Sequence, residues 1–292
     1  MSGRSHPVLA AVWMTGAVVS FTAMAVAGRE IQTEMNTFEL MMYRSAIGFL
    51  VVVALLSAGG SLSQVATRRI DAHVKRNVVH FAAQNFWFYG VAAIPLSQLV
   101  ALEFTSPIWV AVFSPFLLGE RMNRSRVFAA ALGFAGVLIV ARPGVSPIEL
   151  GHGAGLLAAV GFALTNIFTK DITRTDSVLC VLFWMTLMQF AFGLVLALPG
   201  GIPVPSPGVL PWLAVVGIGG LTAHYCLTSA LRAAPATIVA PLEFMRLPLI
   251  AVVGMLVYQE PLVATVFIGA TLILGGNIVN VRHERRRQKA LG

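Results

Sequence analysis

Long apolar runs alternate with short polar segments rich in Gly and Pro along the 292 residues of the chain. Each run is about twenty residues long, the length that an α-helix needs to cross the hydrocarbon core of a bilayer. This pattern predicts an all-α integral membrane protein with ten transmembrane helices. The expected spans lie near residues 8–28, 37–57, 75–94, 98–118, 125–142, 152–170, 178–198, 210–231, 237–258 and 262–281.

Composition agrees with a membrane protein. Hydrophobic residues make up 57% of the chain, charged residues 11%, and the mean hydropathy is +0.82. A soluble domain carries about 25% charged residues, so a water-soluble fold is excluded. The net charge of +8 does not indicate a nucleic-acid partner, because the basic residues lie in short loops and in the tail at 282–289. The first apolar run is expected to remain in the mature protein, since it is long and many more runs follow it.

The positions of Lys and Arg predict the orientation of the spans. Short cytoplasmic loops retain positive charge. With ten spans and a cytoplasmic N-terminus, sixteen of the twenty Lys and Arg residues fall on the cytoplasmic side. Arg29 and Arg142 fall on the other side, and Arg44 and Arg246 fall inside spans. Both termini are therefore expected in the cytoplasm of a bacterium, with the helices in its inner membrane.

The chain also matches itself at an offset of 140 residues. Leu102-Glu103-Phe104 aligns with Leu242-Glu243-Phe244, and identities continue across 93–142. The expected unit is thus a five-helix repeat, with one copy in 1–145 and a second in 146–292. Because five is odd, the second copy enters the membrane from the opposite side, as in transporters built from inverted repeats. A duplication retained only for packing is the alternative.

In each half a proline precedes an acidic residue, by thirteen residues in the first half and by twelve in the second. Pro107 precedes Gly119-Glu120-Arg121, and Pro248 precedes Glu260 by twelve residues. With the ten spans and the duplication, this chain resembles the EamA-type members of the drug/metabolite transporter superfamily. It is most similar to the bacterial aromatic amino acid exporters. The resemblance implies a secondary transporter that exports aromatic or hydrophobic amino acids, or similar metabolites, by alternating access around a central cavity.

Four charged residues lie inside the predicted spans, where each calls for a partner or a watery cavity. They are Arg44, Glu103, Glu243 and Arg246. Arg44 and Glu103 have similar expected depths, which predicts that they pair. Glu243 and Arg246 are spaced i, i+3, which predicts a second pair on one helix face. Structural ion pairs and a role of either glutamate in binding substrate or protons are both open.

Polar and aromatic residues recur at helical spacing in several spans. The 140-residue offset aligns Gln84 in the third span with His224 in the eighth, as two symmetry-related polar positions. Packing and helix–helix hydrogen bonds are the alternatives for any one of these side chains. The candidate substrate-binding residues of a central cavity are His80, Gln84, Trp87, Phe88, Trp13, Phe21, Phe162, Asn166, His224, Tyr225 and Thr228.

Two prolines inside spans, Pro107 and Pro248, interrupt the backbone hydrogen bonds and are candidate hinges or kinks.

Cys180 and Cys226 have no further Cys or His at ligand spacing, so they are expected to pack as reduced side chains, with no metal and no cofactor. No phosphate loop, HExxH or GxSxG motif occurs. An ATP-driven pump and an enzyme are therefore not expected. A channel, a facilitative permease or a broad-specificity drug exporter remains the alternative to a monomeric carrier, and proton coupling stays open.

Overall fold

The computed structural model describes residues 6–118, 124–142, 147–233, 239, 242–243 and 245–291. This part of the chain contains helices, turns and loops, with no strand in the described ranges. Two single 3-10 turns cover Leu62–Val65 and Leu198–Gly200. The α-helices are α1 (Pro7–Ile31), α2 (Thr37–Ala58), α3 (Ile70–Ala93), α4 (Leu96–Glu103), α5 (Ser106–Leu118), α6 (Arg124–Ala141), α7 (Leu150–Ile172), α8 (Val178–Ala197), α9 (Leu210–Ala233), α11 (Arg246–Tyr258) and α12 (Ala264–Leu291).

Most predicted spans coincide with one of these helices. Six segments are long and apolar enough to cross a membrane, and shorter apolar helices cover Ala130–Ala141, Arg246–Tyr258 and Ala264–Val279. α3 starts at Ile70, five residues before the third predicted span, because its first turns are polar and do not extend the apolar run. Arg76, counted among the cytoplasmic charges, lies inside α3.

The fourth predicted span is two helices and not one. α4 ends at Glu103, and α5 begins at Ser106. At the break, the Thr105 hydroxyl donates to the Leu102 carbonyl at 2.7 Å, and the Trp109 indole N–H donates to Thr105 Oγ1 at 3.2 Å. Pro107 occupies the first turn of α5, where its missing N–H removes no helical hydrogen bond.

A similar interruption occurs in the second half. Met245 forms a turn directly before α11, and it aligns with Thr105 at the 140-residue offset. Pro248 is the third residue of α11. Each half therefore carries an acidic residue, Glu103 or Glu243, just before an interrupted helix. The Gly119-Glu120-Arg121 motif lies outside the described residues.

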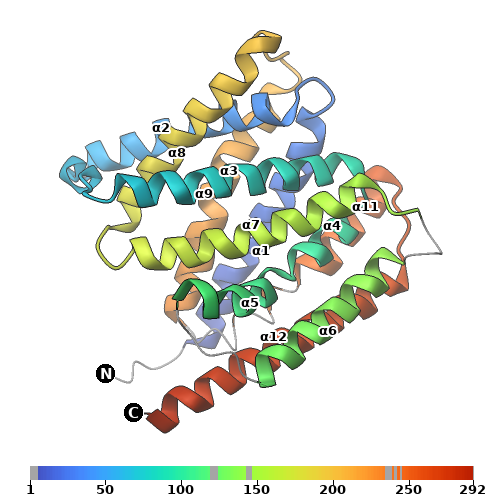
Figure 1. Cartoon of the computed structure of the whole chain (residues 1–292). Helices are drawn as coiled ribbons and strands as arrows, with labels where there is room; N and C mark the ends of the chain where they lie inside the picture. Colours follow the sequence, from blue (N-terminus) through green and yellow to red (C-terminus); the bar gives the residue numbers. More distant parts are fainter. Residues whose placement is uncertain are drawn as a thin grey trace.

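Helix packing pairs the two halves of the chain. The most extensive contacts join α1 with α9, α3 with α7, α2 with α8, and α6 with α12. Figure 1 shows the α2 and α8 pair at one edge of the bundle and the α6 and α12 pair at the other. Glycine allows the closest approaches: a Cβ on Gly136 of α6 would meet the Gly269 carbonyl oxygen of α12 at 2.6 Å.

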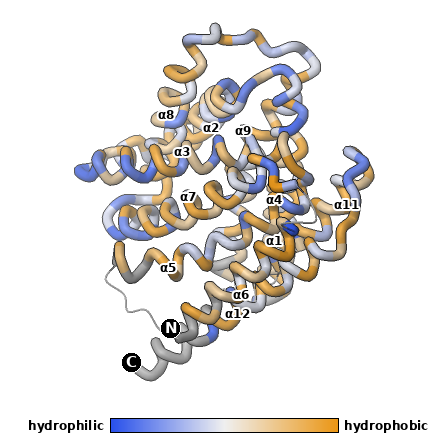
Figure 2. Tube along the Cα trace, turned by 45° about the vertical axis from the view of Figure 1, so that its right-hand side comes forward, coloured by the Kyte–Doolittle hydropathy of each residue, from blue (hydrophilic) through white to orange (hydrophobic). Residues whose placement is uncertain are grey.

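The outer surface of the bundle is apolar. Large side chains such as Val12, Leu50, Phe116 and Phe134 are exposed, which suits helices surrounded by lipid. Figure 2 shows mainly hydrophobic helices whose hydrophilic residues gather toward the loops, with a few polar positions inside. Those internal polar positions line the candidate functional site.

Candidate functional site

A cavity of about 390 Å³ lies inside the bundle. This volume falls within the ~300–1,000 Å³ range of small-molecule pockets. Side chains from α1, α2, α3, α7, α9 and α11 and from the α4–α5 break line it, so both halves of the chain contribute. The interrupted helices bring Glu103 and Arg246 into its wall.

Most of the predicted site residues line this cavity. On α3 a single stripe supplies the aromatic and polar groups, since positions 80, 84, 87 and 88 share one helix face. The neighbouring helices add rings that contact this stripe and one another. The His80 and Phe162 rings are 5.9 Å apart, and the Phe21 and His224 rings are 5.5 Å apart. The predicted residues that line the cavity are His80, Gln84, Trp87, Phe88, Phe21, Phe162, Asn166, His224, Arg44, Glu103, Glu243, Arg246 and Pro107.

Four predicted residues do not line it: Trp13, Tyr225, Thr228 and Pro248. Tyr225 follows His224 by one position, about 100° around the helix, so it faces outward when His224 faces the cavity. It is 66% exposed and makes an edge contact with Trp13, with ring centroids 5.7 Å apart. The Thr228 hydroxyl donates to the His224 carbonyl one turn earlier, at 2.8 Å.

The predicted ion pairs were wrong. Glu103 pairs with Arg246, whose Nη2 lies 2.8 Å from Glu103 Oε1, and neither Arg44 with Glu103 nor Glu243 with Arg246 forms the expected pair. Similar depth did not identify the partner of Glu103, because packing around the helix axis decides which side chains meet, and α4 packs against α11. Glu103 also accepts a hydrogen bond from the Trp87 indole N–H at 2.8 Å.

Aromatic rings complete the environment of Arg246. Its guanidinium carbon lies 5.1 Å from the Phe21 ring centroid and 5.0 Å from that of Phe104. Arg246 is only 3% exposed. The ion pair and the two cation–π contacts together keep this charge neutralised inside the bundle.

Arg44 has a different environment at another wall of the cavity. The hydrogen-bond partners around Gln84 decide which end of its amide is oxygen. In that orientation the amide oxygen accepts from Arg44 Nη1 at 2.6 Å and from Nη2 at 3.2 Å. The Gln84 amide nitrogen then donates to Gln189 Oε1 at 2.9 Å. Arg44 also opens onto a side chamber of about 20 Å³, lined in part by Ser45, Gln189 and His224.

Several cavity residues were missed in the sequence. Arg76 is 7% exposed and lines the cavity, one turn before His80 on the same stripe of α3. On α7, Thr165 and Thr169 share a face with Phe162 and Asn166 at i, i+3, i+4, i+7 spacing. Extending the predicted faces of α3 and α7 by one turn, toward the loops that carry Lys and Arg, would have included Arg76 and Thr169.

At the opposite end of the bundle, Arg29 ties several helices together. Its guanidinium donates to the carbonyl oxygens of Val91 and Ile94 at the end of α3, both at 2.6 Å, and forms an ion pair with Glu260. Glu260 in turn accepts from the Leu96 amide at 2.9 Å. This network gives Glu260, part of the repeated motif, a role in holding α1, α3, α4 and the end of α11 together.

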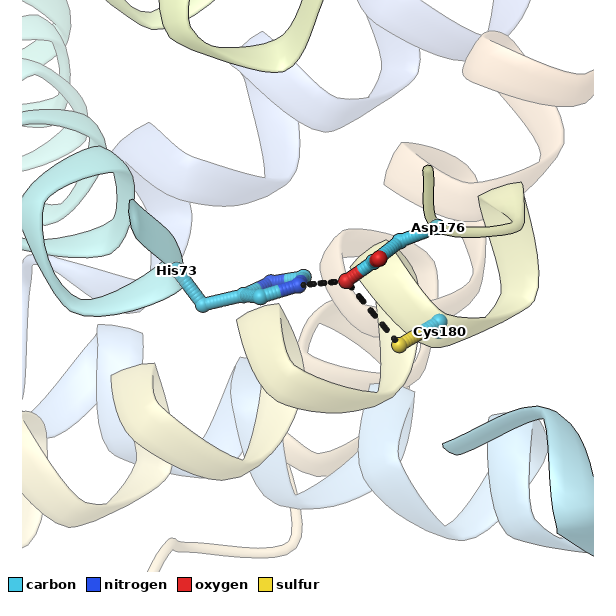
Figure 3. Close-up of side chains that lie close together, drawn as sticks. All are labelled: His73, Asp176 and Cys180. Atoms are coloured by element: carbon cyan, nitrogen blue, oxygen red, sulfur yellow. Dashed lines mark hydrogen bonds and ion pairs between the residues drawn. The ribbon is translucent and has the colours of Figure 1, made fainter. Parts of the chain in front are cut away.

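A buried cluster lies outside the cavity, near the basic loops (Figure 3). His73 Nε2 is 2.8 Å from Asp176 Oδ2, and Cys180 Sγ is 3.9 Å from the same oxygen. Burial raises the pKa of Asp176, but hydrogen bonds from Thr67 and His73 outweigh it and hold that pKa below its ordinary value. All three potential ligand atoms fall within 4.8 Å of one another, a grouping that sequence spacing did not reveal. His73 Nε2 and Asp176 Oδ2 bond each other directly. The expectation of no metal stays a prediction.

Comparison with known proteins identifies the family. The model of the EamA-like transporter family matches this chain twice, over residues 8–142 and 149–282. The chain belongs to the EamA-like transporter family. It is therefore a multi-pass transporter of the bacterial inner membrane and not an enzyme, as the sequence predicted.

Relatives of this EamA-like chain include named transporters of riboflavin and of S-adenosylmethionine. It is 28% identical to a riboflavin transporter of Rhizobium johnstonii over 98% of this chain and 95% of the relative. It is 24% identical to an S-adenosylmethionine uptake transporter of Rickettsia prowazekii, covering 94% and 92%. A solved crystal structure with 20% identity superposes with a TM-score of 0.66 and covers 95% of this chain and 98% of that one, which shows the shared fold. The specific resemblance to aromatic amino acid exporters finds no support among these relatives.

Proposed function

We propose that this protein carries a planar, polar metabolite of the flavin class across the membrane by alternating access around the 390 Å³ cavity. The observation that carries the proposal is the cavity wall. Trp87, Phe88 and Phe162 offer faces and edges on which a heteroaromatic ring can stack, while Gln84 and Asn166 offer hydrogen bonds to its polar edge. The riboflavin transporter among the relatives supports this ring class.

Alternating access requires two halves that exchange conformations. We propose ten spans with cytoplasmic termini, arranged as inverted repeats over 1–145 and 146–292. The helix pairs support this arrangement: the repeat exchanges the α1–α9 pair with the α3–α7 pair, and it maps α2–α8 and α6–α12 onto themselves. The interruptions before α5 and α11 supply the paired hinge points, with Pro107 and Pro248 in the first turn of each.

The proposed direction is uptake, with the described conformation open toward the cytoplasm. Arg76 and Thr169 line the cavity at the ends of α3 and α7 that lead to the basic loops. At the other end, Arg29 and Glu260 join four helices. Opening toward the outside would break that network, which makes it the proposed outer gate. Because both halves of one chain build the cavity, a monomer is the proposed working unit.

Uptake of radiolabelled riboflavin into liposomes that contain the purified protein tests the proposal. We expect saturable uptake that unlabelled riboflavin competes away, whereas phenylalanine and tryptophan do not compete. Flux that fails to saturate would indicate a channel. Repeating the assay with and without a pH gradient determines whether protons are coupled. Uptake no greater than in empty liposomes would contradict the proposed substrate class.

Two tryptophans provide a matched pair of variants. Trp87 lines the cavity, while Trp13 contacts Tyr225 outside it. Trp87→Leu is expected to lower uptake about tenfold at low substrate concentration, because a stacked ring and an indole hydrogen bond are lost. Trp13→Leu is expected to transport like the unmodified protein. Equal losses in both variants would show that general helix packing, and not the cavity, limits transport.

A further inference from the structure

We infer that the transported solute carries an anionic group, a carboxylate or a phosphate, and that Arg44 and Arg76 bind it. The inference rests on the proposed transport function of the cavity, and it concerns a group that the aromatic walls do not explain. Three arginines line the cavity against two glutamates, Glu103 and Glu243. The walls alone therefore carry an excess positive charge.

The arginines of this bundle fall into two kinds. Arg246 pairs with Glu103, and Arg29 pairs with Glu260. Arg44 instead meets only neutral acceptors in the described part of the chain: the Gln84 amide oxygen and, at 3.8 Å, the Met41 sulfur. A guanidinium away from water needs an anion to offset its desolvation. The protein supplies that anion to Arg246 and Arg29 but not to Arg44.

Arg76 shows the same pattern one helix away. Its Nε donates to Thr169 Oγ1 at 3.1 Å, and its Nη1 donates to Asn77 Oδ1 at 2.7 Å. Both acceptors are neutral. Arg76 is 7% exposed, and it opens onto the same cavity as Arg44. Two guanidiniums on α2 and α3 thus share one space with no carboxylate from the described residues bonded to either.

Unused hydrogen-bonding groups mark where the anion would bind. Arg44 Nε and Ser45 Oγ are buried, and neither has a partner within the described ranges. Both residues line the side chamber of about 20 Å³, which has room for one water or one solute oxygen. Gly220 lies against the guanidinium, since a Cβ at that position would meet Arg44 Nη2 at 2.8 Å. Because glycine has no side chain, the guanidinium fits against α9 at this position.

Chemistry favours a carboxylate or phosphate as the occupant. Both present two oxygens to the planar fork of an arginine, and charge-assisted bonds of this kind are about twice as strong as neutral ones. The arrangement would fix a solute with its ring among Trp87, Phe88 and Phe162 and its anionic end at Arg44. An alternative is that the two arginines only stabilise water in the cavity, in which case they would not distinguish charged from neutral solutes.

Two matched pairs of probes test the inference on the purified full-length protein in neutral detergent. The first pair is riboflavin 5′-phosphate and riboflavin, followed by flavin fluorescence. The second is indole-3-acetate and indole-3-acetamide, followed by the shift in thermal unfolding. Each pair shares a ring and differs in charge. We expect the anionic member to bind about tenfold or more tightly than its neutral partner, as a hydrogen-bonded ion contact gives.

Variants assign that preference to the guanidinium. Arg44→Gln is expected to lower the affinity for the anionic probe about tenfold more than the affinity for its neutral partner, and Arg44→Lys is expected to retain part of the preference for the anion. Gly220→Ala displaces the Arg44 guanidinium without changing the charge. This variant is expected to reduce the preference for the anionic probe several-fold. Arg69→Gln is the control. It removes the same formal charge as Arg44→Gln, but at a residue that pairs with Asp171 outside the cavity.

The outcomes separate this inference from the proposed function. Equal binding of charged and neutral members in both pairs, or an Arg44→Gln variant that keeps the preference, would overturn the anionic group but leave flavin transport standing. Preference for indole-3-acetate with no flavin binding would overturn the flavin class and support the anionic group. Competition by phosphatidylglycerol against both anionic probes would assign the guanidiniums to a lipid headgroup and overturn a solute role.

Discussion

Arg246 and Arg44 are the same residue type in the wall of one cavity, yet their surroundings differ. Arg246 lies between the rings of Phe21 and Phe104 and pairs with Glu103. Arg44 is held by the neutral amide of Gln84, and no carboxylate from the described residues bonds to it. The protein thus supplies an anion to the first guanidinium, while the proposed solute supplies one to the second. Charge in a membrane span thus serves structure at one site and recognition at the other.

Breaking the complete pair should have the largest effect. Glu103→Gln leaves the Arg246 charge buried without an anion, and we expect a loss of about 3–5 kcal/mol in the free energy of unfolding. Thermal unfolding in detergent, without solute, measures it. The double variant with Glu103→Gln and Arg246→Gln should recover most of the loss, because neither member of the pair is left as a buried charge without the other. A single variant as stable as the unmodified protein would show that the pair does not hold these helices.

The hydrogen bond to the same carboxylate should be next in size. Trp87→Phe keeps the ring but removes the indole N–H that donates to Glu103. We expect a loss of about 1.5–3 kcal/mol, typical of a bond to a charged group. Trp109→Phe is the matched control: its lost bond ends on the neutral Thr105 hydroxyl, so about 0.5–1.5 kcal/mol is expected. The two unfolding curves would contradict the comparison if the order were reversed.

Removing the other arginine should change stability little. Arg44→Gln takes away a charge that no carboxylate in the described residues neutralises, so we expect less than about 1 kcal/mol of change in the solute-free protein. Unfolding of Arg44→Gln beside Glu103→Gln provides the direct contrast. A loss from Arg44→Gln as large as that from Glu103→Gln would mean that Arg44 is structural.

The smallest effect is expected at the buried carboxylate near the basic loops. Asp176 has a pKa below its ordinary value in the folded protein. Its stabilising contribution is therefore complete above about pH 3.9 and is lost as the pH falls through the lowered pKa. Asp176→Asn should be less stable than the unmodified protein at neutral pH, and this difference should disappear in acid. Asp71→Asn, at a residue whose side chain is 71% exposed, should show little difference at any pH.

Helix content and most cavity-lining residues were predictable because each depends on local pattern. Apolar runs of membrane length located the helices, and the predicted stripe on α3 from His80 to Phe88 lines the internal cavity. The break between α4 and α5 was less accessible. Pro107 lies close to this break, but the fourth predicted span, 98–118, is one continuous apolar run in the sequence.

Errors arose where orientation around a helix or the start of a polar helix mattered. Tyr225 and Thr228 were grouped with His224 because they are adjacent in sequence, although a helix turns about 100° per residue. Arg76 was counted among the cytoplasmic charges because it lies at the polar start of the third predicted span. The expected Arg44–Glu103 pair followed from equal depth, which carries no information on which helices face each other.

The membrane class, the helices and the family could be inferred from the order of residues along the chain, because lipid imposes length and polarity on every span. Which guanidinium receives a carboxylate could not be inferred in that way. An ion pair depends on the packing of α4 against α11 and on where each side chain points in three dimensions. The same packing left Arg44 and Arg76 facing the cavity, and it is from their neutral surroundings that the chemistry of the solute can be inferred.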